Sequence, residues 1–98
     1  QKDVEPNYAY FPVIISEKEF GATRNDVAMV LASQDIYARK YFYPLTNTFA
    51  CFHGQYDVEN TPVALHLSKH VLTLPLYPDL ELSDIDRICD IVLKLSGR

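Results

Sequence analysis

The chain has 98 residues, 48% of them apolar, and its nine basic and thirteen acidic side chains give a formal net charge of −4 at pH 7. This length accommodates one domain with one core, and the negative charge gives a nucleic acid backbone or an anionic membrane no electrostatic footing. No apolar run approaches the roughly 18 residues that cross a bilayer, and the N-terminus lacks a signal-peptide layout, so we expect a cytoplasmic protein without nucleic acid or membrane partners.

The first third of the chain predicts a strand followed by a helix. Residues 8–15 are rich in aromatic and β-branched side chains, and Pro12 places this strand at a sheet edge or a bulge because proline cannot donate to a ladder. Thr23 lies three residues before Asp26, which is the spacing of a capping box at a helix start. The buried stripe of this helix is expected to hold Val27, Val30 and Leu31.

Residues 36–43 resume β-type composition and predict a second strand, whose side chains alternate between two faces. One face receives Ile36, Ala38 and Phe42, and the other receives Tyr37, Arg39, Tyr41 and Tyr43. Guanidinium pairs with carboxylates or phosphates and phenols donate hydrogen bonds, so the second face is a candidate substrate site. Cation–π support at a domain interface is the alternative reading of the same face. If the strand at 8–15 pairs with the strand at 36–43, three further candidates join this surface: Asn7, Tyr8 and Tyr10.

Residues 45–60 are irregular, and their length suggests a functional or interface loop. Proline after Thr61 then favours a helix start, and the apolar face of that helix is expected to hold Val63, Ala64, Leu67 and Val71. A short strand follows, because Leu72, Leu74 and Leu76 alternate with other residues.

The last helix is expected to be capped by Ser83 with Asp86 and to end at Ser96 and Gly97. Its buried stripe is expected to hold Ile85, Ile88, Cys89, Val92 and Leu95. The order of these elements predicts the α+β class, with a small, mainly antiparallel sheet and helices on one face.

Two pairs of potentially reactive side chains favour structural readings. Cys51 and Cys89 lack metal-site spacing and are too few for a disulfide scaffold, so both are expected to be free thiols, with Cys89 packed in the core. His66 and His70 share a helix face at a spacing that metal ligands can use, but no H-E-x-x-H pattern surrounds them. Solvent-exposed helix residues are the favoured reading, and no metal site is expected.

Three ordered motifs carry a resemblance to a known family: N-Y-A-Y-F-P at 7–12, A-R-K-Y-F-Y-P-L at 38–45, and P-V-A at 62–64 leading into V-L-T-L-P-L-Y-P at 71–78. Together they resemble the C-terminal portion of DegT/DnrJ/StrS-type sugar aminotransferases, over nearly the whole chain. A related pattern reads A-R-R-Y-F-Y-P, and Lys40 here replaces its second arginine, which keeps the charge and loses the planar fork.

The resemblance implies the small domain of a dimeric, fold-type-I enzyme that uses pyridoxal 5′-phosphate to move an amino group, usually from glutamate, onto a nucleotide-linked keto sugar. Residues 1–98 are then a fragment without the large cofactor-binding domain, an expectation that the first residue, Gln1, also suggests. The fragment alone is expected to bind no cofactor and to hold no catalytic residue, because its lysines match no family lysine motif: Lys2, Lys18, Lys40, Lys69 and Lys94.

Within this resemblance, the expected contribution of the chain is closure of the substrate cleft. The candidate substrate-binding residues are Arg39, Tyr41, Tyr43, Asn7 and Tyr8. The alternative is a free-standing protein-interaction module that binds a partner through residues 37–43.

Overall fold

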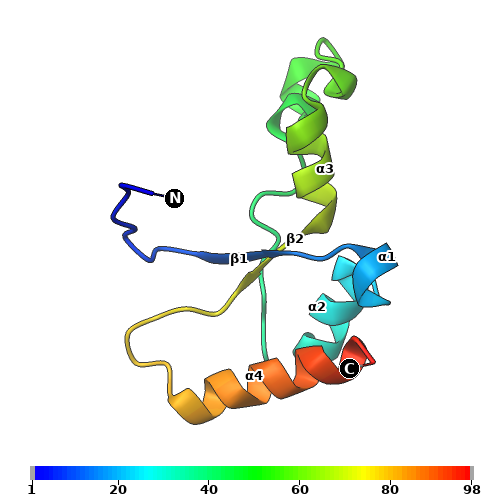
Figure 1. The fold of residues 1–98 in the computed structure, drawn as a ribbon. Helices are drawn as coiled ribbons and strands as arrows, with labels where there is room; N and C mark the ends of the chain where they lie inside the picture. The colour runs from blue at the N-terminus through cyan, green and yellow to red at the C-terminus, as the bar shows by residue number, and fades with distance from the viewer. Residues whose placement is uncertain (1, 98) are drawn as a thin grey trace.

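A computed structural model describes residues 2–97, which form a small antiparallel sheet and four α-helices, one of which lies in an arm that projects from the rest of the molecule (Figure 1). Strand β1 (Phe11–Ile14) pairs with β2 (Val71–Leu74) in a register that sets Val13 opposite Leu72. On its other side β2 forms a single antiparallel bridge between Thr73 and Arg39. The expected α+β class with an antiparallel sheet is confirmed, and β1 is an edge strand, as Pro12 predicts.

One short helix follows β1 before the polypeptide reaches its first longer helix. Helix α1 (Glu17–Phe20) ends at Gly21, whose φ of 91° is the left-handed conformation that glycine adopts without strain. Helix α2 (Arg24–Ala32) starts at the predicted capping box, in which Thr23 accepts a hydrogen bond from the Asp26 amide and the Asp26 side chain bonds the Thr23 amide.

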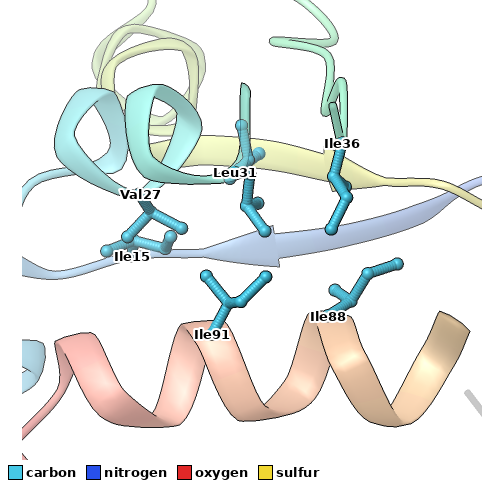
Figure 2. Close-up of a cluster of buried hydrophobic side chains, with 7 residues drawn as sticks. Ile15, Val27, Leu31, Ile36, Ile88 and Ile91 are labelled. Carbon is cyan, nitrogen blue, oxygen red and sulfur yellow. The ribbon is translucent and has the colours of Figure 1, made fainter. Parts of the chain in front are cut away.

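The core lies where α2 and the last helix, α4 (Leu82–Leu95), meet below the sheet (Figure 1). Figure 2 shows Val27 and Leu31 of α2 pointing toward Ile88 and Ile91 of α4, and the buried core cluster is completed by Ile15, Ile36 and Leu72. Arg87 reinforces this contact, because its Nη2 donates to the Gln34 carbonyl at the end of α2 over 2.6 Å.

The predicted start and stripe of α4 are partly wrong. The helix begins at Leu82 after Glu81, and no side chain caps it, so Ser83 with Asp86 is not the cap. Ile85 and Cys89 are exposed instead of packed in the core, whereas Ile91 is buried. Ile91 belongs to the core cluster together with Val27 and Leu31 of α2, the helix against which α4 packs. The end at Ser96 is confirmed.

The arm comprises residues 44–70, namely three 3-10 turns and helix α3, and Figure 1 shows it extending away from α2 and α4. The turns are η1 (Thr46–Thr48), η2 (Ala50–Phe52) and η3 (Val58–Asn60), which confirms an irregular segment. Helix α3 (Pro62–His70) starts at the proline, as predicted. The arm gives the molecule a radius of gyration of 15.6 Å, compared with about 13 Å for a compact chain of 100 residues.

Two further expectations need correction. Residues 36–43 do not form a strand, because the bridge at Arg39 is followed by a turn in which the Tyr43 amide donates to the Lys40 carbonyl over 2.6 Å. The predicted apolar face of α3 does not include Val71, which lies in β2 and is buried, and the rest of that face is exposed, since Val63 and Leu67 have 72% and 41% of their surface accessible. Only Ser68 of this helix is buried. Within residues 2–97, no helix has the length and apolar character to cross a membrane.

Candidate functional site

The centre of the candidate site is Arg39, whose backbone is fixed against β2. Its amide donates to the Thr73 carbonyl over 2.9 Å, and its carbonyl accepts from the Thr73 amide over 2.6 Å. Two reciprocal bonds of this kind define an antiparallel pair and leave the two side chains beside each other. The predicted alternation holds for the first residues of the segment, since Ile36 is buried and Tyr37 is exposed.

Aromatic rings hold the Arg39 side chain at the surface. Its Nη1 donates to the Tyr41 hydroxyl over 2.8 Å, and its guanidinium carbon lies 5.7 Å from the Tyr41 ring centroid. The Tyr41 ring stacks on Phe42 with centroids 4.9 Å apart, and the edge-to-face contact with Tyr10 has a centroid distance of 5.5 Å. The guanidinium is therefore oriented before any ligand arrives, which lowers the entropic cost of binding one.

A hollow of about 170 Å³ lies beside this side chain. Its lining comprises Ala9, Tyr10, Tyr37, Arg39, Tyr41, Thr73, Leu74, Pro75 and Leu76. The Thr73 hydroxyl is buried there and has no hydrogen-bond partner among residues 2–97. A cationic fork, phenols and a small apolar floor together suit an anionic group carried on a compact organic molecule.

The structure brings some of the predicted site residues together and separates others. Tyr37 lines the same hollow as Arg39 and Tyr41, whereas Tyr43 turns away from them. Asn7 bonds locally, its side chain accepting from the Ala9 amide over 3.2 Å, and Tyr8 is 74% exposed. These two residues precede β1, and β1 pairs with β2 rather than with residues 36–43, so the pairing that would carry them into the surface does not form.

Tyr43 instead contacts Arg24 at the neck of the arm, the point where the polypeptide enters and leaves it. The Arg24 guanidinium carbon lies 5.1 Å from the Tyr43 ring centroid, and Nη1 donates to the Ser68 and Val71 carbonyls, each over 3.0 Å. Ser68 lies in the last turn of α3, where helix carbonyls lack partners. Burial lowers the pKa of Arg24, and the Tyr43 phenol opposes that shift.

Sequence reasoning gave too little weight to three residues of this region. Tyr10 contributes the ring that supports Tyr41, while Thr73 supplies the backbone that fixes Arg39. The alternation with Leu72 and Leu74 predicts that Thr73 lies on the opposite face of its strand, but the pairing of Thr73 with Arg39 was not predicted. Arg24 had no comparable signal, because the first residue of a helix is ordinarily exposed.

The described residues do not fit a covalent pyridoxal phosphate site. Such a site needs a lysine held in a shielded cavity where it forms a Schiff base with the cofactor. The lysines between residues 2 and 97 are exposed or only partly buried, and the hollow beside Arg39 contains none of them.

The two histidines of α3 have a geometry that suits packing rather than metal binding. Their rings stack with centroids 4.3 Å apart, and the His70 Nδ1 lies 2.7 Å from the His66 carbonyl oxygen. Across residues 2–97, no group of three or more potential ligands from His, Cys, Asp and Glu comes together. Cys51 and Cys89 are free thiols, as predicted.

Comparison with known proteins defines the class to which this fold and surface belong. Residues 1–93 match the model of the DegT/DnrJ/EryC1/StrS aminotransferase family. The chain therefore belongs to this family, which confirms the resemblance read from its motifs.

Individual relatives are sugar transaminases. The chain is 35% identical over 89 residues to a dTDP-4-amino-4,6-dideoxy-D-glucose transaminase of Escherichia coli, with 89% of this chain and 24% of that protein covered. A transaminase of the same name from Shigella dysenteriae is 34% identical over 79 residues, with 81% of this chain and 21% of that protein covered. The chain thus spans about a quarter of the length of the curated relatives it matches.

Solved structures support the fold. A sugar aminotransferase from Streptococcus pneumoniae, solved in PLP, PMP and apo forms, superimposes on the chain with a TM-score of 0.74 and 24% sequence identity. The match covers 90% of this chain and 22% of the other. The α+β arrangement is accordingly that of a segment found within PLP-dependent sugar aminotransferases.

Proposed function

We propose that residues 1–98 are the C-terminal small domain of a PLP-dependent aminotransferase that transfers an amino group from glutamate to a nucleotide-linked keto sugar. Membership of the aminotransferase family supports this proposal, as do relatives named as transaminases of a dTDP-linked amino sugar. The whole enzyme then holds its cofactor in a domain outside this chain, works as a homodimer, and uses the present domain to close the substrate cleft.

The observation that carries the proposal is the Arg39–Tyr41 pair beside the hollow. Both proposed substrates are anionic, glutamate through its carboxylates and the sugar nucleotide through its phosphates. A guanidinium binds either group through two parallel hydrogen bonds. Tyr41 accepts one hydrogen bond from Nη1, so other N–H groups of Arg39 remain available to a ligand. We assign Arg39 to substrate binding, with Tyr41 as the residue that positions it.

The experiment compares Arg39→Ala with Lys40→Ala in the whole enzyme, because the neighbouring cation is a matched control outside the pair. Loss of a charge-assisted hydrogen-bond pair costs about 1.5–3 kcal/mol, so Arg39→Ala lowers kcat/KM by roughly 10- to 100-fold for the substrate that it contacts. Lys40→Ala changes kcat/KM by less than about threefold, the range expected for a partly exposed surface charge.

Single-turnover measurements of the two half-reactions identify which substrate Arg39 binds. A loss confined to the half-reaction with glutamate assigns the residue to the amino donor, and a loss confined to the keto-sugar half-reaction assigns it to the acceptor. Unchanged kcat/KM for both substrates in Arg39→Ala would refute the role of this residue.

A further inference from the structure

The arm has little packing of its own. Its helix α3 has nine residues, and helices shorter than about 12 residues depend on tertiary contacts for their stability. The main contact of α3 is with η3, which is itself a single turn of the arm. Helix α3 is attached to the core at its C-terminal end, through the Arg24 bonds to the Ser68 and Val71 carbonyls.

An apolar surface runs along this arm. Val63, Ala64 and Leu67 form an exposed stripe on α3. Ala64 also lines a shallow hollow of about 480 Å³ whose wall is mostly apolar and includes Leu45, Phe52 and Tyr56. The stripe and the hollow share Ala64 and are therefore continuous, and we call them together the arm surface.

Composition separates this region from the ordinary surface of the chain. Residues 44–70, the arm, contain three charged side chains, Asp57, Glu59 and Lys69, whereas 22% of the residues in the whole chain are charged. Three aromatic residues lie in the same stretch, Phe49, Phe52 and Tyr56, and the last two line the hollow. Depletion of charge is a compositional mark of the buried centre of an interface.

We infer that the arm surface is an interface that docks onto the cofactor-binding domain of the same polypeptide. The choice of occupant rests on the proposed function and on length, since about three quarters of the relatives' sequence lies outside the segment that this chain matches. Contacts within one polypeptide need no second molecule, so they cover the apolar stripe at any protein concentration. The same contacts supply the tertiary packing that α3 lacks.

The first test measures the accessibility of the arm surface in the whole protein. Val63→Cys introduces a thiol at a position that is 72% exposed in the structure described above, and Cys89, exposed on α4, is the matched reference in the same molecule. Peptide mass spectrometry follows the rate at which a maleimide labels each thiol, and labelling in 8 M urea gives their intrinsic ratio. After this normalisation, residue 63 is expected to react at least tenfold more slowly than Cys89.

Equal normalised rates at the two positions would overturn the inference, because they would show that the stripe is open to solvent in the whole protein. This readout requires no turnover. An enzyme that transaminates normally while position 63 is fully labelled refutes the docking surface and leaves the proposed function standing. A protein without transaminase activity in which position 63 is protected supports the docking surface and counts against the proposed function.

The second test identifies the occupant. Photo-crosslinking from p-benzoylphenylalanine in place of Val63 is performed on protein reassembled from equal amounts of ¹⁴N- and ¹⁵N-labelled molecules. Docking within one polypeptide gives cross-linked peptide pairs of a single isotope, joined to residues outside this chain. Pairs of mixed isotope would place the arm against a second copy and would overturn the assignment, as would a yield no higher than that from the same photoprobe at Met29, an exposed residue of α2.

Discussion

Replacement of Arg24 by methionine tests how the arm is joined to the core. Arg24 is 5% exposed and donates two hydrogen bonds over 3.0 Å to the Ser68 and Val71 carbonyls. Methionine keeps the apolar stem of the side chain and its packing, but removes the donors and the contact with Tyr43.

The expected loss of stability follows from opposing contributions. A hydrogen bond from a charged donor contributes about 1.5–3 kcal/mol, and the cation–π contact adds about 0.5–1 kcal/mol. The guanidinium is buried without a carboxylate partner, and its desolvation destabilises the folded state. Removal of this charge therefore offsets part of the stability that is lost with the hydrogen bonds. We expect a net loss of about 2 kcal/mol, which lowers the urea midpoint by roughly 1–2 M at the m-value of a small domain.

Urea unfolding followed by far-UV circular dichroism measures this difference, with Arg24→Lys as the control. Lysine keeps the charge but lacks the planar fork that reaches two carbonyls, so its midpoint should fall between those of the wild type and the methionine variant. If Arg24→Met were as stable as the wild type, the two hydrogen bonds would only offset the cost of burying the charge. The Arg24 bonds would then not stabilise the junction between the arm and the core.

Three further outcomes can be checked on the same chain. Leu31→Ala, at a side chain with no exposed surface, should cost about 2–5 kcal/mol in urea unfolding, and a cost below 1 kcal/mol would contradict the assigned core. Thr23→Ala should cost about 1 kcal/mol. Hydrogen bonds from the Thr23 side chain and then its backbone lower the pKa of Asp26 from its ordinary 3.8, against a smaller opposing effect of burial, so the stability from this pair is complete above that value and is lost as the pH falls through the lowered pKa. Thr23→Ala should weaken this acid dependence; an unchanged pH profile would count against the capping box. Both Cys51 and Cys89 should react with Ellman's reagent in the folded chain, and one equivalent instead of two would mean that Cys89 is buried after all.

Local signals in the sequence predicted the local features of the fold. The capping box at Thr23 and the helix start at Pro62 need only a few neighbouring residues, and both are found where they were expected. The alternation of Leu72 and Leu74 predicted β2 for the same reason. Each feature is decided by interactions within one turn or one strand.

Features that depend on distant partners were predicted less well. Residues 36–43 have strand composition, but only Arg39 lies against β2 before the polypeptide turns. Periodicity predicted an apolar stripe on α4. The packing of α4 against α2 buries Ile91 and leaves Cys89 exposed. For the site, alternation placed Arg39 beside Tyr37, whereas the contacts of Tyr41 with Tyr10 and of Tyr43 with Arg24 come from tertiary structure.

The neck at Arg24 has a consequence for how the length of the arm can change. One side chain contacts Tyr43, where the polypeptide enters the arm, and binds the Ser68 and Val71 carbonyls, where it returns to the sheet. Both ends of the arm are thereby fixed to α2, and each doubling of the length of a loop closed in this way costs only about 0.6 kcal/mol. A change in the number of residues between 45 and 60 therefore alters the arm at a small entropic cost and leaves the contacts of the core in place.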